Sequence, residues 1–139
     1  MNKQAEPFMV EASPQVGRDR AHEPAHLHVA GEATYIDDIR ELDGTLHAAL
    51  GLSPVAHGKL VAIDIERLRA EPGVTAVYTA ADIPGVNDVG PIVHGDDPIL
   101  ADGVVHYLGQ PMFAVIAADR RIARRVAARA KEFVTIEPL

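Results

Sequence analysis

The sequence contains no cysteine among its 139 residues. Disulfide bonds, thiolate zinc sites, thiol nucleophiles and iron–sulfur clusters held by the chain's own thiolates are therefore excluded. No apolar run approaches the roughly 20 residues that a membrane-spanning helix needs, so no membrane partner is expected. Residues 1–16 are polar, are interrupted by Pro7 and Pro14, and lack the pattern of a signal peptide. We expect a cytoplasmic protein.

Motifs for phosphate binding and nucleophilic catalysis are also missing. The chain has neither G-x-x-x-x-G-K-[ST] nor G-x-G-x-x-G. No G-x-S-x-G turn surrounds Ser53, so a serine nucleophile of that type is excluded. Gln110 lies in a Gly-Gln-Pro turn and could donate to a ligand oxygen, but we favour a solvated or locally bonded amide.

Charge of one sign is concentrated in a single segment. The chain carries a net charge of −7, yet residues 119–132 hold six cationic and two acidic side chains. That segment has a net charge of +4, which leaves −11 for the rest of the chain. Phosphate binding needs a net cationic footprint, so the acidic remainder argues against a nucleic-acid partner.

The length and hydrophobic patterning predict one α+β domain with a short lead-in. Residues 1–16 should form a flexible lead-in, and residues 17–139 the folded domain. We expect about seven strands, within residues 29–39, 45–53, 56–65, 74–79, 99–108, 112–118 and 134–136. Because residues 45–53 are almost continuously apolar, that strand should be covered on both faces.

Helical patterning is clearest after Asp119, a good N-cap residue. Six apolar residues then fall on one side of a helix and the cationic residues on the other: Ile122, Ala123, Val126, Ala127, Ala130 and Phe133. One or two short helices are expected, near residues 64–70 and 80–85. Because strands outnumber helices without alternating strictly with them, an α+β domain is favoured over a doubly wound fold.

Two sets of residues could carry metal or acid–base chemistry. The first is His22, His26 and His28, but Pro24 lies between them and no helix is expected there, so we favour a plain loop. The second is the acid pairs Asp37-Asp38 and Asp96-Asp97. Adjacent residues of a strand point to opposite faces, so these pairs should be turn and surface carboxylates.

The remaining candidates suggest an interface. Residues 86–98 form an unusually long loop for a compact domain, and such loops are often functional or held by a partner. The basic helix face is either a solvated surface or a contact site for an anion or another chain. We hypothesise that both surfaces dock against other polypeptide, through Arg121, Arg125, Asp96 and Asp97.

Five segments occur in order along the chain: GEATYIDDI (31–39), TLHAALGLSPVAHGKL (45–60), PGVTAVYTAADIPGVNDVGP (72–91), DDPILA (96–101) and VHYLGQPMFAVIAAD (105–119). Together they resemble the molybdenum hydroxylases, the family of xanthine dehydrogenases and aldehyde oxidases. The resemblance covers about residues 16–138. The DDPILA segment and the GLS strand are most similar to the molybdopterin-binding subunit of bacterial xanthine dehydrogenases.

The resemblance implies a fold and a role. The chain would be the amino-terminal α/β-hammerhead domain, with a mixed sheet and a flanking helix, of a much longer subunit. The parent enzyme would hydroxylate xanthine or hypoxanthine at a molybdenum–molybdopterin centre. Its electrons would pass through 2Fe-2S clusters and FAD on a partner subunit to NAD. The catalytic and cofactor-binding residues of the family lie in later domains, so none is carried over to this chain, Gln110 included.

Three expectations follow for this chain. It should be inactive alone, and it should contact both the remaining domains of its subunit and the iron–sulfur/FAD subunit. The same domain could instead come from an aldehyde oxidase or a carbon monoxide dehydrogenase. A free-standing module that binds a small molecule or a peptide at residues 86–98 is the alternative of a different class.

Overall fold

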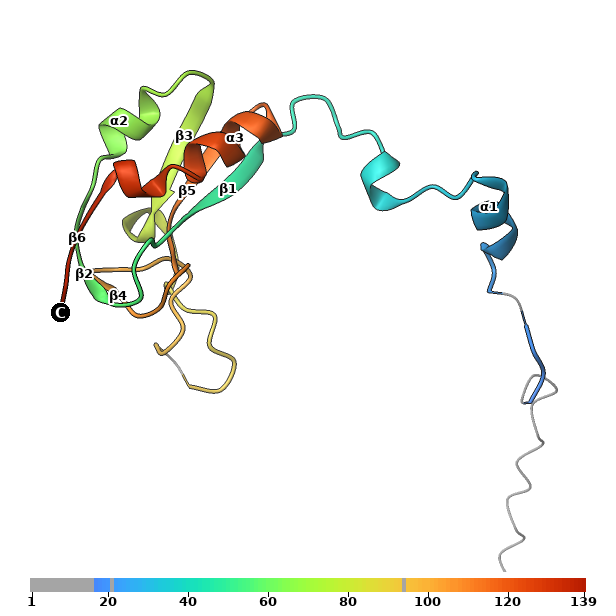
Figure 1. Cartoon of the computed structure of the whole chain (residues 1–139), viewed down its shortest axis with the longest axis horizontal. Coiled ribbons are helices and arrows are strands. Elements are labelled where there is room, and N and C mark those ends of the chain that lie inside the picture. The colour runs from blue at the N-terminus through green and yellow to red at the C-terminus, as the bar shows by residue number, and fades with distance from the viewer. Residues whose placement is uncertain (1–16, 21, 94) are drawn as a thin grey trace, which may run out of the picture. The chain divides into compact units, whose positions relative to one another are not determined.

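A computed structural model describes residues 17–20, 22–93 and 95–139. The chain divides into two compact units, Met1–Arg40 and Glu41–Leu139. The lead-in expected at residues 1–16 lies outside the described residues. Figure 1 shows the elements of the second unit, in which strands and helices pack around one core. Within the described residues, no helix is both long enough and apolar enough to cross a membrane.

The first unit is helical where a strand was expected. It contains α1 (Ala25–Ala30) and a short 3₁₀ helix, η1 (Ile36–Asp38). The strand or hairpin predicted within residues 29–39 is therefore wrong. Gly31 ends α1 with a φ of 73°, and the backbone N–H groups of Glu32 and Ala33 both donate to the carbonyl of Leu27. These local hydrogen bonds satisfy the backbone without a partner strand.

The second unit contains six strands in two sheets within the described residues. The first sheet has the order β1-β5-β3, with β1 (His47–Leu52), β5 (Pro111–Ala117) and β3 (Val74–Thr79). The second has the order β4-β2-β6, with β4 (Val104–Val105), β2 (Gly58–Ile63) and β6 (Val134–Glu137). All pairings are antiparallel, so the single mixed sheet is corrected to two antiparallel sheets. The α+β class is confirmed.

The core lies between the first sheet and the helices. Phe113 and Val115 of β5 are fully buried, together with Leu68 of α2 (Ile65–Arg69) and Val126 of α3 (Arg120–Ala127). Both helices begin at an aspartate whose carboxylate accepts from a first-turn backbone amide. Such caps satisfy amides that a helix leaves unpaired. The same core takes in Phe133, which precedes β6.

The helix predicted after Asp119 is confirmed, although it is short. α3 spans 8 residues, and a 3₁₀ turn, η3 (Ala130–Glu132), continues it toward β6. Its predicted inner face is the observed one: Ile122 is partly buried, and Ala123, Val126, Ala127, Ala130 and Phe133 are buried. The helical turn expected near residue 80 is the 3₁₀ helix η2 (Ala80–Asp82).

Two expectations about strands are not met within this unit. The extended piece predicted over residues 99–108 contains only the two-residue strand β4. The strand expected to be covered on both faces, β1, is covered on one face only within this unit, since Ala48, Leu50 and Leu52 are exposed. The apolar pattern of β1 predicts two covered faces, whereas the unit covers only one of them.

Candidate interface

The long loop is held in shape by its own side chains. Residues 83–93 and 95–103 lie in no helix or strand, and residue 94 is not among the described residues. The Asn87 amide donates to the Leu100 carbonyl at 2.7 Å and accepts from the Leu100 N–H at 3.0 Å. This pair of bonds imitates a step of a β-ladder and ties the start of the loop to its end.

The adjacent carboxylate organises the interior of the loop. Asp88 accepts from the backbone N–H groups of Gly90 at 3.1 Å, Gly95 at 2.7 Å and Asp97 at 3.3 Å. The Val89 N–H donates to the Asp97 carbonyl at 2.9 Å, which closes the loop from the backbone side. The loop therefore has a defined conformation without regular secondary structure.

This ordered loop presents apolar side chains to solvent. Val86, Val89, Ile92 and Val93 are between 56% and 89% exposed. Asp96 and Asp97, two of the predicted interface residues, are exposed on the same loop. A cluster of exposed apolar residues flanked by polar groups is typical of an interaction surface. The acidic pair lies on the loop as expected, whereas the exposed apolar side chains beside it were not predicted from the sequence.

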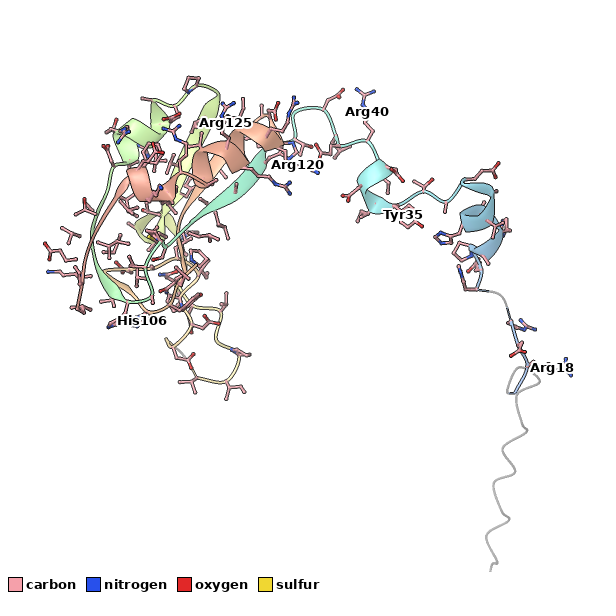
Figure 2. The ribbon with its side chains drawn as sticks, in the orientation of Figure 1. Arg18, Tyr35, Arg40, His106, Arg120 and Arg125 are labelled. Carbon is pink, nitrogen blue, oxygen red and sulfur yellow. The ribbon has the colours of Figure 1, made fainter. Side chains whose placement is uncertain are left out.

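The basic face of α3 is partly neutralised by acids of the same unit. Arg120 pairs with Glu41, Arg121 with Asp119 at 3.3 Å, and Arg129 with Glu71 at 3.0 Å. Arg124 and Arg125 are exposed and have no ion-pair partner among the described residues. In Figure 2 the side chains of Arg120 and Arg125 both project from α3. Unpaired cations thus remain along the middle of the helix.

Several of these contacts shift the acid–base equilibria of the paired groups. The N–H of Arg121, followed by its guanidinium, lowers the pKa of the Asp119 carboxyl. The backbone N–H and hydroxyl of Thr79 lower the pKa of Asp82, which accepts them at 2.7 and 2.9 Å. Arg129 lowers the pKa of Glu132 through a hydrogen bond. These shifts belong to helix caps and surface ion pairs, so they indicate stabilising contacts rather than catalytic groups.

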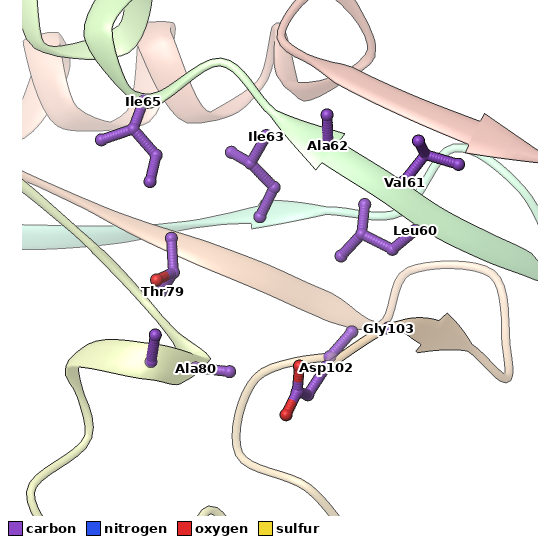
Figure 3. A pocket seen from close by; sticks show the side chains of 11 residues that line it. Leu60, Val61, Ala62, Ile63, Ile65, Thr79, Ala80, Asp102 and Gly103 are labelled. Carbon is purple, nitrogen blue, oxygen red and sulfur yellow. The ribbon is translucent and has the colours of Figure 1, made fainter.

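A groove of about 230 Å³ lies between the two sheets. Figure 3 shows Leu60 and Ile63 of β2 on one side of it, opposite Thr79, Ala80 and Asp102. The Thr79 hydroxyl already donates to Asp82, and Asp102 is the one carboxylate in the lining. The groove therefore brings together neither a nucleophile and base nor two carboxylates.

The other sequence candidates do not converge on a site. Among the described residues, no three His, Asp or Glu side chains lie close enough to hold a metal ion. His28 bonds to the Tyr35 hydroxyl at 2.7 Å, and Asp38 accepts from the Tyr35 N–H. Contrary to our expectation, a helix does form immediately after Pro24, at Ala25. The Ser53 hydroxyl is buried and donates to the Val55 carbonyl at 2.8 Å.

Gln110 is fully buried rather than solvated. Its Oε1 accepts from the His106 N–H at 2.7 Å, which agrees with the locally bonded amide favoured above. Its Nε2 has no partner among the described residues. Gln110 also accepts through its carbonyl from the Ser53 N–H, so it joins the turn before β5 to the end of β1. Gln110 is thus a structural residue of this turn.

Comparison with known proteins identifies the fold. The family described as "Aldehyde oxidase and xanthine dehydrogenase, a/b hammerhead domain" matches residues 30–136. The xanthine dehydrogenase of Oryza sativa subsp. japonica is 38% identical over 119 residues, which are 86% of this chain and 9% of that protein. The xanthine dehydrogenase/oxidase of Gallus gallus is 34% identical over 125 residues, 89% of this chain and 9% of that protein.

Solved structures give the same result. The reconstituted carbon monoxide dehydrogenase from Oligotropha carboxidovorans superposes with a TM-score of 0.70 at 36% identity, covering 88% of this chain and 15% of that one. The aldehyde oxidoreductase from Desulfovibrio gigas gives 0.69 at 31% identity, covering 84% and 14%. The chain thus spans about a tenth of the curated relatives that it matches. It belongs to the aldehyde oxidase and xanthine dehydrogenase family, as an a/b hammerhead domain.

Proposed function

We propose that this chain is the hammerhead domain of a xanthine dehydrogenase-type molybdenum hydroxylase and that its own role is docking. The parent enzyme hydroxylates xanthine or hypoxanthine and passes electrons through iron–sulfur clusters and FAD to NAD. The relatives named xanthine dehydrogenase, 34–38% identical over most of this chain, support this substrate class. We also propose a cytoplasmic location, because the sequence has no cysteine and therefore no disulfide bonds.

The described residues do not fit a molybdenum or iron–sulfur site. The chain has no cysteine, and no cluster of three metal-ligating side chains lies among the described residues. We therefore assign the cofactors to the remaining domains of the subunit and to an iron–sulfur/FAD subunit. No catalytic residue is assigned to this chain.

The ordered apolar loop is the observation that supports docking most directly. Residues 86–93 expose four large apolar side chains, although Asn87 and Asp88 fix the backbone that carries them. A preorganised loop loses little conformational entropy when a partner covers it. The exposed acids Asp96 and Asp97 then provide polar contacts beside the apolar ones, and the exposed cations Arg121 and Arg125 provide polar contacts on α3.

Assembly of the complete enzyme tests this proposal. In the full-length subunit, the variant R121E/R125E should weaken association with the iron–sulfur/FAD subunit by at least about tenfold, because the reversed charges meet like charges in the interface. R69E is the matched control, since Arg69 is an exposed cation on α2. Unchanged assembly of R121E/R125E in size-exclusion chromatography would contradict the role of α3 in docking.

A different substrate is the second candidate function. Solved relatives that act on carbon monoxide, quinoline and aldehydes, according to their names, superpose on this chain with TM-scores of 0.68–0.70. The hammerhead fold therefore accompanies several substrates. Assay of the complete enzyme with xanthine, an aldehyde and an N-heterocycle distinguishes them, and turnover of xanthine alone supports the first proposal. Binding of a small molecule to the 139-residue chain itself would instead support a free-standing module.

A further inference from the structure

One face of the sheet β1-β5-β3 carries an apolar surface that its own unit leaves partly or largely exposed. The register places Leu50, Ala114 and Tyr78 side by side in one row and Ala48, Ile116 and Ala76 in the next. Paired residues of antiparallel strands point to the same side of a sheet. We call these six residues the outer face.

The opposite side of the same sheet is buried in the core of the unit. Phe113, Val115 and Val77 point to that side and are buried in the core with α2 and α3. On the outer face, by contrast, Leu50 is 49% exposed and Tyr78 is 50% exposed. Ala48 is also exposed, and Ala76, Ala114 and Ile116 are only partly buried.

The sequences of β1 and β5 are those of strands buried on both sides. A strand with one wet face alternates between apolar and polar residues, whereas a doubly covered strand is almost continuously apolar. β1 reads HAALGL and β5 reads PMFAVIA, and neither strand contains Asp, Glu, Lys or Arg. None of the six residues of the outer face is charged. The pattern therefore requires a second cover that the described unit does not supply.

The edge of the outer face extends this surface. A shallow groove of about 450 Å³ runs along β1, lined by Leu50 and Leu52 on the strand side and by Arg124 of α3 on the other. Arg124 has no ion-pair partner among the described residues. A partner surface that covers the outer face should therefore be apolar and uncharged at its centre. Where it reaches the groove, it should carry an acidic group that pairs with Arg124.

We propose that the outer face is the surface on which the remaining polypeptide of the same subunit docks. This inference rests on the proposed function, because the occupant is part of the parent enzyme. The matched region is only 9–15% of its relatives, so a much larger body of chain is available in them to cover it. An uncharged, continuously apolar surface is typical of permanent contacts between parts of one assembly rather than of transient ones.

Thiol labelling of the complete enzyme tests the occupant. The chain lacks cysteine, so a thiol introduced into it gives a unique site that peptide mapping identifies. The variants are L50C and A48C, of which A48C adds only one sulfur atom to an exposed position and preserves the fold. A70C is the matched control, since Ala70 is an exposed alanine at the end of α2, outside the outer face.

Maleimide should modify both outer-face thiols in the native enzyme at least about tenfold more slowly than A70C, since the thiol reacts only when its cover opens. In guanidinium chloride all three should react equally. Equal native rates would overturn the proposal. Protection that vanishes on dilution would assign the face to a second copy, and protection that vanishes when residues 1–40 are deleted would assign it to the first unit. Either result also overturns the proposal.

The result is independent of the substrate. An enzyme that oxidises an aldehyde instead of xanthine, but protects A48C, refutes the proposed substrate and retains the docking face. An enzyme that oxidises xanthine but leaves A48C and L50C fully reactive refutes the docking face alone. A native protein that consists of this chain without further polypeptide refutes both.

Discussion

The aromatic ring of Phe113 fills the space beside the backbone of Gly51, its neighbour across the β1–β5 pair. A Cβ atom added at position 51 would overlap the ring atoms of Phe113, which is itself fully buried in the core. Glycine at this point of β1 thus allows the far end of the ring to approach the strand closely. The contact joins an edge strand to the centre of the first sheet.

The substitution G51A should destabilise the domain by about 1–3 kcal/mol, because the added methyl group forces a shift of a buried ring. Urea unfolding followed by circular dichroism measures this loss. G85A is the matched control, since a Cβ at Gly85 meets no atom within 4 Å, and it should change stability by less than about 1 kcal/mol. Equal stability of the two variants would show that the ring moves without cost.

The substitution N87A should loosen the loop while leaving the core folded. It removes both hydrogen bonds to Leu100, each worth about 0.5–1.5 kcal/mol. Amide hydrogen exchange at Val89 should then accelerate by about 5- to 150-fold, while that of Val115 stays unchanged. N87D keeps the acceptor for the Leu100 N–H and should give an intermediate rate. Slow exchange at Val89 in N87A would mean that Asp88 alone orders the loop.

The capping carboxylates predict a definite dependence on pH. The folded-state pKa values of Asp82 and Asp119 lie below their ordinary values, because backbone N–H groups donate to the carboxylates. Their contribution is therefore fully present at pH 7 and is lost as the pH falls through the folded-state pKa values, below about 4. D119N should be less stable than the parent at pH 7, and urea titrations should show this difference closing in acid. A difference that grows in acid would contradict the assigned cause.

The substitution Q110E places a carboxyl group at a fully buried position. Its Oε1 can still accept from the His106 N–H, so the protonated form keeps the native contact. Burial raises the pKa of a carboxyl group, so the new carboxyl group at position 110 is neutral in acid. The variant's stability should therefore be about that of the parent at low pH. It should then fall by about 1.4 kcal/mol per pH unit above roughly pH 4, up to the raised pKa. A constant difference between pH 4 and 8 would show that water enters the site.

Much of the second unit follows from local sequence. Five of the six strands lie within apolar or β-branched runs, and Asp119 with its periodic apolar partners fixes the place of α3. The pairing of strands does not follow in the same way. Whether β2 joins β1 or β6 depends on contacts distant in sequence, so one mixed sheet was expected where two antiparallel sheets form.

Other errors have identifiable causes. Residues 29–39 were predicted to be extended from scattered apolar residues, but Gly31 closes α1 locally and the described residues of this unit bury no side chain. The loop at residues 86–98 was predicted, while the side-chain hydrogen bonds that order it were not. Asn87-Asp88 followed by Gly90 is a turn signal that indicates side-chain bonds to nearby backbone groups, and it was available in the sequence.

The four residues predicted to form an interface are all exposed, but one of them already has an ion-pair partner. Exposure of Asp96, Asp97, Arg121 and Arg125 agrees with an interface role, but Arg121 already pairs with Asp119. Arg124, which the sequence analysis did not single out, lies beside the outer face and has no ion-pair partner among the described residues. Which cations of α3 lie beside the outer face depends on how the helix is oriented on the sheet. Helical periodicity alone does not specify that orientation.

The most direct test of the central claim is the mass and cofactor content of the native protein purified through this domain. An affinity tag at residue 1 and intact mass spectrometry suffice. We expect a polypeptide several times larger than 14.9 kDa that contains molybdenum and co-purifies with an iron–sulfur flavoprotein subunit. A native species of 14.9 kDa without molybdenum or a partner would contradict it.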